Sequence, residues 1–213
     1  MFNTHSHRSD VQRRAFTLIE LLIVMSIILL LAAVLIGTVP GIFKRARIAQ
    51  TKNMFGGWAT SLLSYKSTYR YYPNLGAGYN SNEDSYFTLD QEEVGQNFVR
   101  ALSARDMDGR ELTDEERKNL NRKGQPFCTF PSEHYLDNKP QKHKLADAFG
   151  NTNIHIVLDT DDDNILKLKN ADDFRADDIG LIESTKLNAR ILIYTLKKDG
   201  GSSSDFEDVW HKQ

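Results

Sequence analysis

One apolar segment near the N-terminus constrains this chain more than any other feature. Residues 21–43 contain no charged side chain, and Arg13 and Arg14 precede them. Such a run exceeds the ~18 apolar residues typical of a membrane-spanning helix. The mean hydropathy of the whole chain is −0.48, so the remainder is polar. The sequence therefore predicts one membrane-spanning segment attached to a polar domain.

A single carboxylate, Glu20, stands at the start of this apolar segment. A charged side chain costs ~3 kcal/mol at the centre of a membrane helix and less near its ends. A cleaved signal peptide has an apolar core of about 7–15 residues followed by a small-residue cleavage site. The apolar segment of this chain is longer and has no such site after it, which disfavours a cleaved signal peptide. A plain signal anchor accounts for the length of the segment but leaves Glu20 without a partner. A carboxylate in apolar surroundings is tolerated when another group pairs with it.

The residues "RRAFTLIELLIVMSI" (13–27) resemble the N-terminal signal of type IV prepilins and of the pseudopilins of type II secretion systems. The resemblance implies that residues 1–15 are a cytoplasmic leader peptide, which a membrane peptidase removes between Ala15 and Phe16. Ala15 stands where the family usually has glycine. Phe16 then becomes the N-terminus and is methylated. In the filament, the carboxylate of Glu20 pairs with the N-terminal ammonium of a neighbouring subunit.

An apolar stripe follows the first segment. Its side chains are spaced by three and four residues, as on one face of a helix, and they are Phe55, Trp58, Leu62, Tyr65, Tyr69 and Tyr72. Pro73 disfavours the helical conformation of the residue before it, so we expect the helix to end at Tyr72. We therefore predict one long helix, with a transmembrane or filament-core half (residues 16–43) and an amphipathic half (residues 44–73).

The remaining residues, 74–213, predict a head of helices and strands. Two capping-box spacings, Asp90 with Glu93 and Thr113 with Glu116, predict helices at 90–106 and 113–124. Residues 74–89 are rich in Gly, Asn and Ser and predict a loop. Alternating or β-branched segments predict strands at 127–130, 153–158, 165–169 and 189–196.

This order of elements predicts an α+β fold. A long helix followed by antiparallel strands buries its apolar face on a small sheet. The same arrangement, a long N-terminal helix packed on a small antiparallel β-sheet head, is the pilin-like fold that the resemblance implies. The resemblance extends to "LADAFGN" (145–151) and "YTLKKDGGSSSDFEDVW" (194–210), which are similar to a turn and to the C-terminal segment of major pseudopilins.

Two acidic segments are candidates for a structural Ca²⁺ ion. The C-terminal segment binds calcium in major pseudopilins, and the resemblance implies Asp199, Asp205 and Asp208 as the ligands here. The weaker alternative is "DTDDDN" (159–164), which places Asp159, Asp161 and Asp163 at positions 1, 3 and 5 of a calcium-loop pattern. Position 6 is not glycine and position 12 is not glutamate, so the pattern disfavours a complete EF-hand. An acidic hairpin turn remains the other interpretation of this segment.

The sequence gives no pattern for catalysis. We find no spacing typical of a catalytic triad, a zinc site or a phosphate-binding glycine loop, and we predict no enzymatic activity. A net charge of −2 provides no basic field for nucleic acid. The single cysteine, Cys128, excludes an intrachain disulfide.

The resemblance implies a structural subunit, most similar to the major pseudopilin of type II secretion systems, that polymerises into a pseudopilus or type IV pilus for protein secretion. The implied partners are further copies of the chain, a prepilin peptidase and N-methyltransferase, other pseudopilins and an inner-membrane assembly platform. The implied location is the bacterial inner membrane, crossed once, with the head in the periplasm and the filament in the periplasm or at the cell surface. Two alternatives stay open: a minor pilin that primes or tips the filament, and a signal-anchored periplasmic binding protein that never polymerises.

Overall fold

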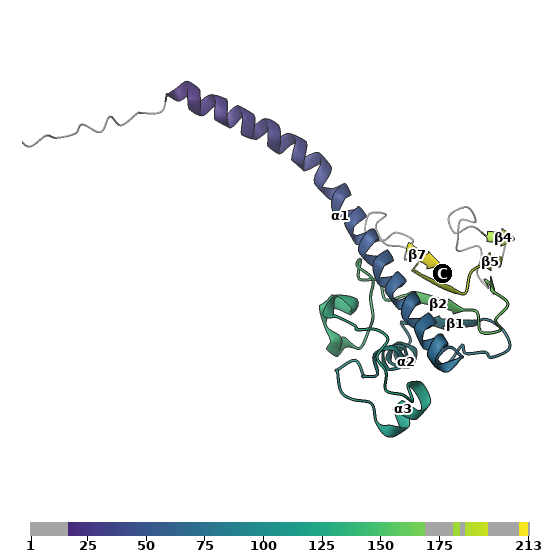
Figure 1. Ribbon diagram of the computed structural model, residues 1–213. Coiled ribbons are helices and arrows are strands. Elements are labelled where there is room, and N and C mark those ends of the chain that lie inside the picture. The colour runs from purple at the N-terminus through teal and green to yellow at the C-terminus, as the bar shows by residue number, and fades with distance from the viewer. Residues whose placement is uncertain (1–16, 169–180, 184–185, 196–208, 213) are drawn as a thin grey trace, which may run out of the picture. The chain divides into compact units, whose positions relative to one another are not determined.

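The computed structural model describes residues 17–168, 181–183, 186–195 and 209–212, the side chains of residues 34–40, 181–183 and 209–211 excepted. The chain divides into two compact units, Met1–Lys44 and Arg45–Gln213, and each is described by itself. Helix α1 (Leu18–Tyr69) contributes residues to both (Figure 1). Within the described residues, we find no helix that combines the length and the apolar character needed to cross a bilayer.

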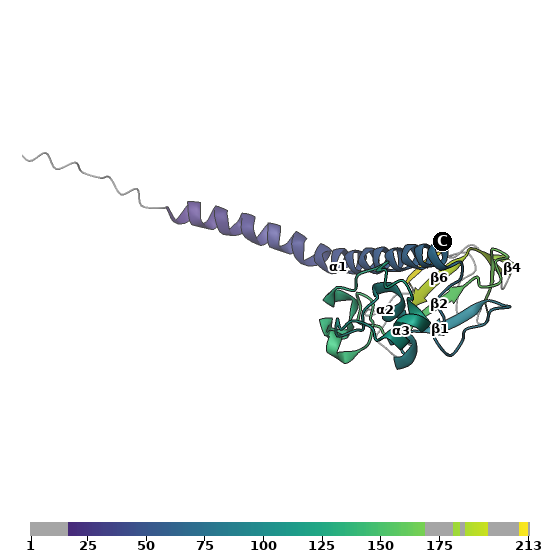
Figure 2. The same cartoon turned by 60° about the horizontal axis from the view of Figure 1, so that its bottom comes forward.

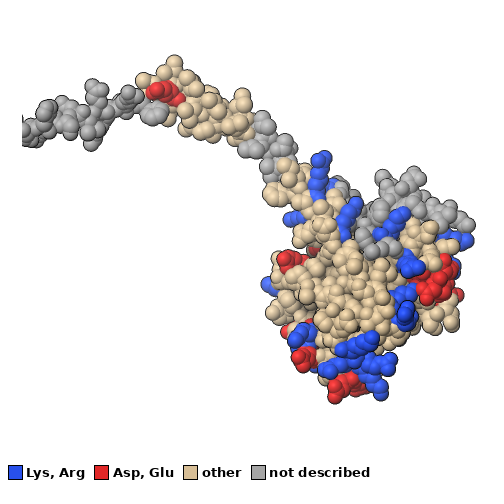
Figure 3. Space-filling model, in the orientation of Figure 1, with Lys and Arg blue, Asp and Glu red and all other residues tan. Residues whose placement is uncertain are grey.

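The first unit presents apolar side chains around the whole of α1. All the large apolar side chains from Leu18 to Leu31 are exposed, and the least exposed of them, Val24, is 46% exposed. Glu20 is the only charged residue between residues 17 and 43. Figure 3 shows this segment as uncharged surface with one acidic patch, whereas acidic and basic side chains are interspersed on the head. Apolar surface of this extent needs a cover of lipid or protein.

Two antiparallel sheets form the strand part of the second unit (Figure 1). The main sheet has the order β1-β2-β6-β7, and its strands are β1 (Ser85–Thr88), β2 (Ile154–Leu158), β6 (Ile191–Thr195) and β7 (Val209–Lys212). The smaller sheet has the order β3-β5-β4, and its strands are β3 (Ile165–Lys167), β5 (Lys186–Asn188) and β4 (Leu181–Glu183).

Strands β2 and β6 are buried on both faces of the main sheet. Ile156 and Ile193 belong to the core that the sheet shares with the second half of α1, which lies across this face in Figure 2. Val157 and Leu192 belong to a second core, which includes Leu187 of the smaller sheet. Burial on both faces explains why these strands have nearly continuous apolar sequences instead of a strict alternation.

The aromatic stripe of α1 lies in the main core, as predicted. Phe55, Trp58 and Leu62 have no exposed surface. The ring of Trp58 makes an edge contact with Phe98, their centroids being 5.3 Å apart. The hydroxyl of Tyr65 donates a hydrogen bond of 2.6 Å to the backbone oxygen of Leu120, which satisfies the one polar atom that this side chain buries.

Helix α1 ends at Tyr69, before the predicted end at Tyr72. Arg70 adopts a left-handed conformation with a φ of 72°, and its N–H still donates to the carbonyl of Lys66 at 2.7 Å. A left-handed residue of this kind is a common helix stop. The turn leaves Tyr72 buried, with the ammonium of Lys66 4.2 Å from the centre of its ring. The helix thus ends at the left-handed Arg70, before the position predicted from Pro73, and the turn that follows buries Tyr72.

Two further helices cover the core, and only one has the predicted cap. In α3 (Asp114–Leu120), the Thr113 hydroxyl accepts from the backbone N–H of Glu116, and the Glu116 carboxylate accepts from the N–H of Thr113 at 2.8 Å. In α2 (Glu92–Ser103), the N-cap is Gln91, without a side-chain bond, so the predicted cap at Asp90 was wrong. The carboxylate of Asp90 instead accepts from the Thr152 hydroxyl at 2.9 Å. Both helices are shorter than predicted.

The strand predicted at residues 127–130 was wrong. The N–H groups of Phe127 and Cys128 both donate to the carbonyl of Leu102, at 2.7 and 3.0 Å, and the segment is fixed to the end of α2 instead of a ladder. Strand β1 lies where a loop was predicted. Three 3₁₀ turns follow the misassigned segment, η1 (Ser132–His134), η2 (Leu136–Asn138) and η3 (Pro140–Lys142). The α+β class is confirmed, with an N-terminal helix and a small antiparallel sheet, compatible with a pilin-like fold.

Candidate functional site

The N-terminal motif begins the first helix with a capping box. The predicted cleavage residues Ala15 and Phe16 lie outside the described residues. Directly after them, the backbone N–H and the hydroxyl of Thr17 donate to Oε2 of Glu20 at 2.8 and 2.9 Å. The N–H of Glu20 donates back to the Thr17 hydroxyl at 3.3 Å. This reciprocal pair of hydrogen bonds satisfies two backbone N–H groups, of Thr17 and Glu20, that have no carbonyl partner in the first turn of the helix.

The capping box also orients the Glu20 carboxylate. Both bonds from Thr17 use Oε2, and among the described residues we find no partner for Oε1. A carboxylate oxygen can accept more than one hydrogen bond. Glu20 can therefore cap its own helix and accept a proton donor from another molecule at the same time. The sequence T-x-x-E at 17–20 has the spacing of a capping box, so a local signal for this interaction is present in the sequence.

The predicted acidic residues divide into two groups. Asp199, Asp205 and Asp208 lie outside the described residues, and calcium binding by them stays a prediction. In the other segment, one carboxylate oxygen each of Asp159 and Asp161 converges with one of Asp84, all within 4.8 Å of one another. Asp163 is not part of this group. Its carboxylate accepts from the backbone N–H of Ile165 at 2.7 Å and pairs with Lys167 at 3.0 Å.

The register of the main sheet brings Asp84 to this group. Strands β1 and β2 are antiparallel, and Ser85 pairs with Leu158. Asp84 directly precedes the first of these residues and Asp159 directly follows the second, so the two carboxylates meet at the same end of the sheet. Sequence analysis missed Asp84, because β1 itself was not predicted and no local pattern links residues 75 positions apart.

Burial dominates the electrostatics of this acidic cluster, which we define as Asp84, Asp159 and Asp161. Burial raises the pKa of Asp84 to about 6, against the backbone N–H of Lys167, which lowers it. Burial and the neighbouring carboxyl of Asp161 raise the pKa of Asp159. Burial opposes ionisation of Asp161 as well, but the ammonium of Lys167 leaves its pKa below the usual range. Burial and mutual repulsion therefore make it costly to ionise all three carboxyl groups of the cluster at once.

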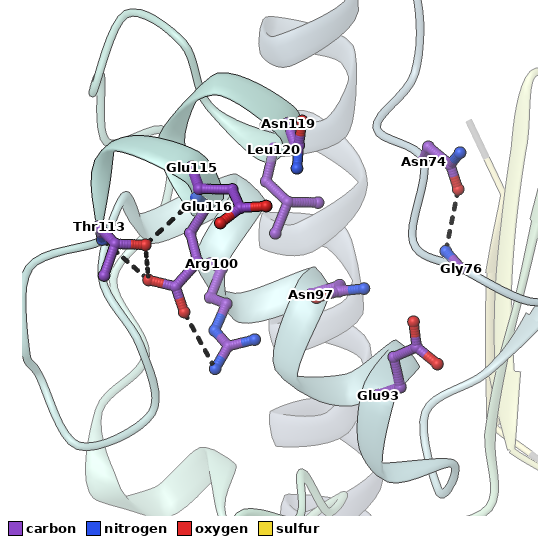
Figure 4. Close-up of a pocket in the computed structure, with 10 residues that line it drawn as sticks. All are labelled: Asn74, Gly76, Glu93, Asn97, Arg100, Thr113, Glu115, Glu116, Asn119 and Leu120. Atoms are coloured by element: carbon purple, nitrogen blue, oxygen red, sulfur yellow. Dashed lines mark hydrogen bonds and ion pairs between the residues drawn. The ribbon is translucent and has the colours of Figure 1, made fainter.

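A cavity of about 750 Å³ lies between α2, α3 and the loop after α1 (Figure 4). In Figure 4 the guanidinium of Arg100 points toward the carboxylate of Glu116, and Nη2 of Arg100 lies 3.5 Å from Oε1 of Glu116. The same carboxylate is held by Thr113 in the capping box of α3. Its fixed hydrogen bonds give Glu116 a structural role in joining α3 to α2.

The Glu116 interactions predict a specific dependence of stability on acid. The backbone N–H and hydroxyl of Thr113, and then Arg110, lower the pKa of Glu116 to about 2. Its contribution is present above the ordinary pKa of 4.5 and is lost as the pH falls through about 2. We expect Glu116→Gln to lose less melting temperature between pH 4.5 and pH 2 than the parent chain. Thermal unfolding of the full chain in detergent, at pH 4.5 and pH 2, measures this difference. Glu115→Gln is the control for net charge. Equal loss of melting temperature in the parent chain and in Glu116→Gln would contradict the prediction.

The cysteine and a histidine share a groove of about 680 Å³ beside α1. The Sγ of Cys128 donates to the backbone oxygen of Thr129 at 3.3 Å. Burial raises the pKa of the Cys128 thiol and lowers the pKa of His134. Both shifts favour the neutral forms, whereas an activated cysteine nucleophile requires a thiolate. The directions of these pKa shifts therefore give no support to covalent catalysis by this pair.

Comparison with known proteins finds a similarity at the N-terminus. The family model of the prokaryotic N-terminal methylation motif matches residues 11–36, which include the capping box and much of the exposed apolar segment. No curated protein and no solved structure matches the chain. The methylation motif implies a membrane-anchored N-terminus that a prepilin peptidase processes, and it supports a type IV prepilin-like protein.

Proposed function

We propose that this chain is the subunit of a helical filament, a pseudopilin that serves a type II secretion system. The observation that carries the proposal is the match to the methylation motif at residues 11–36, which contains the exposed apolar segment of α1 from Leu18 to Leu31. On this proposal a prepilin peptidase cuts between Ala15 and Phe16 and the new N-terminus is methylated. The subunit waits in the inner membrane with its head in the periplasm, and it then joins the filament. The motif is that of a structural family, which favours assembly over catalysis.

The exposed apolar segment gives the physical reason for assembly. Lipid covers such a helix as well as protein does, so moving it from the bilayer into a bundle of equal polarity costs little hydrophobic free energy. Packing between helices and one specific ionic contact then decide the equilibrium. Glu20 is suited to that contact, because its capping box holds the carboxylate while Oε1 remains available.

The assignment to a pseudopilus, rather than to a surface pilus, is supported by two short sequence similarities. The segments 145–151 and 194–210 resemble major pseudopilins. In the first of them, the carboxylate of Asp147 accepts from the N–H groups of Phe149 and Asn151 at 2.8 and 2.9 Å and forms a closed turn. The N–H of Ala148 donates to the hydroxyl of Thr51 on α1 at 3.2 Å, which ties this turn to the amphipathic half of the helix.

Assembly in cells tests the proposed function. We would express the chain in a bacterium with a working type II secretion system and isolate sheared filaments from cells that overproduce it. We expect filaments that contain this chain as the repeating subunit, seen by electron microscopy and by immunoblot. A chain that is processed and membrane-bound, but absent from filaments while a resident major pseudopilin assembles normally, would instead support a non-polymerising anchored protein.

A further inference from the structure

We propose that Asp84, Asp159 and Asp161 together bind one Ca²⁺ ion, which joins the end of the main sheet to the turn before β3 and stabilises the head. This inference goes beyond the proposed function, since it concerns the folded head whether or not the chain polymerises. It also assigns calcium to a place different from the C-terminal carboxylates that the family resemblance implies.

The spacing of the acidic cluster fits one calcium ion. One oxygen from each of the three carboxylates lies within 4.8 Å of the other two. Calcium binds oxygen at 2.3–2.6 Å, so two oxygens on one ion can be at most about 5 Å apart. Three oxygens at this spacing need only small side-chain movements to bind one ion together.

An unpartnered buried oxygen provides a second, independent indication. Asp84 is 4% exposed, and its Oδ1 has no hydrogen-bond partner among the described residues. Oδ1 of Asp161 likewise lacks a partner in the described part of the chain. Buried polar atoms nearly always have a partner, and an exception calls for a specific cause such as a bound ion. A cation between these carboxylates would supply that partner.

The neighbouring lysines do not fill this role. The ammonium of Lys167 lies 3.1 Å from Oδ2 of Asp161 and 3.0 Å from Oδ2 of Asp163. The ammonium of Lys66 pairs with Asp162 and donates to the backbone oxygen of Asp159 at 3.3 Å. Neither lysine donates to Oδ1 of Asp84 or to Oδ1 of Asp161, so these two oxygens of the cluster have no donor among the described residues.

Hydrogen bonds hold the cluster in place before any ion binds. The two carboxylate oxygens of Asp159 accept from the N–H groups of Asp163 and Asn164, each at 3.1 Å. Oδ2 of Asp84 accepts from the N–H of Lys167 at 2.6 Å. The hydroxyl of Thr160 lies 3.1 Å from that of Ser85, which joins the two segments that carry the carboxylates. Ionised carboxylates retain further lone pairs for a metal ion.

The chemistry of the ligands favours calcium. Three carboxylates are hard oxygen donors, which bind Ca²⁺ or Mg²⁺ rather than the softer transition metals. The cluster is carried on a turn, and calcium tolerates irregular geometry and completes its shell of 6–8 oxygens with water and carbonyl groups, whereas Mg²⁺ requires near-octahedral geometry. With three protein carboxylates, we expect a Kd of about 10⁻⁴ M, at the tight end of the range for extracellular calcium modules.

Calcium titration of the full chain in detergent tests the site. After treatment with EDTA and dialysis, we expect 10 mM CaCl₂ to raise the melting temperature by about 5 °C, and 10 mM MgCl₂ to give a clearly smaller rise. We expect Asp84→Asn to abolish the calcium response. The same variant removes a buried charge, so it should also raise the melting temperature of the metal-free chain. A variant that had lost calcium binding only through damage to the fold would have a lower melting temperature instead.

The control is Asp162→Asn, which removes the same charge from an exposed position of the same turn and should keep the calcium response. The proposal is overturned if calcium leaves the melting temperature of the parent chain unchanged. It is also overturned if Asp84→Asn keeps the response while Asp205→Asn loses it, since the ion then binds at the C-terminal segment. A larger shift with magnesium than with calcium would refute the choice of cation.

Discussion

Replacing Glu20 by glutamine is expected to leave processing of the chain intact and to abolish its incorporation into filaments. In the proposed filament this carboxylate pairs with the ammonium of a neighbouring Phe16 in an apolar bundle. Removing one partner of a buried ion pair costs about 3–5 kcal/mol, because the other charge stays buried and unpaired. A loss of this size lowers the equilibrium for adding a subunit by more than about a hundredfold.

Glutamine separates the charge of Glu20 from its role as a cap. Glutamine occurs in capping boxes, so Glu20→Gln keeps an acceptor for the N–H of Thr17. The matched variant is Thr17→Val, which removes the hydroxyl of the capping box and keeps the carboxylate. Loss of a cap costs about 1 kcal/mol, or about a fivefold change. We therefore expect Thr17→Val to assemble with modest loss.

The measurement compares the sheared-filament and membrane fractions of the two variants, with the mass of the N-terminus as the control for processing. Normal filaments from Glu20→Gln would show that no charge pairing is needed. Equal defects in Glu20→Gln and Thr17→Val would contradict the larger contribution that we assign to charge pairing by Glu20.

Replacing Gly78 by alanine is expected to destabilise the head by about 3 kcal/mol, the largest effect that we expect from adding one methyl group. Gly78 has a φ of 103°, and a Cβ at this position would lie 1.9 Å from the backbone oxygen of Tyr86. That oxygen belongs to β1, whose N–H at Tyr86 donates to the carbonyl of Gly78 at 3.1 Å. Because both groups are backbone, the clash can be relieved only by moving the edge of the main sheet.

Gly109→Ala is the matched control. Gly109 has a φ of 81°, and a Cβ there would meet no atom within 4 Å. Its cost is limited to the strain of a positive φ, about 1–2 kcal/mol. Denaturant unfolding of the full chain in detergent, followed by tryptophan fluorescence, to which the buried Trp58 contributes, measures both variants. Equal stability of Gly78→Ala and Gly109→Ala would contradict the close approach of Gly78 to β1.

Local patterns in the sequence were sufficient where a structural element depends on neighbouring residues. The spacing of Phe55, Trp58 and Leu62 predicted a buried helix face, and these side chains have no exposed surface. The spacing of Thr113 and Glu116 predicted the cap of α3, since both partners of a capping box lie within one helical turn.

Local patterns failed where distant residues compete for the same group. Asp90 has the spacing of a cap, but its carboxylate binds Thr152, which is 62 positions away. Residues 127–130 have the composition of a strand, but their N–H groups bind the end of α2. Tertiary contacts override propensity in both cases, as they commonly do for short segments.

The acidic cluster shows the same division. The alternation of Asp159 and Asp161 was visible in the sequence, because both lie on one turn. Their third partner, Asp84, depends on the register of β1 and β2, which only the folded sheet defines. Asp163 had the right spacing, but its carboxylate does not converge with the other three and accepts from the backbone N–H of Ile165 two residues later.

The mass of the mature N-terminus decides whether this chain is a prepilin. Mass spectrometry of the protein purified from bacterial membranes with an active prepilin peptidase should find a chain that begins at Phe16 and carries one methyl group on its amine. Ala15→Gly is the control, since it restores the family's usual residue and should be processed at least as completely. A chain that keeps Met1, or that is cut after the apolar segment, would contradict the proposal that α1 is retained as the core of a filament.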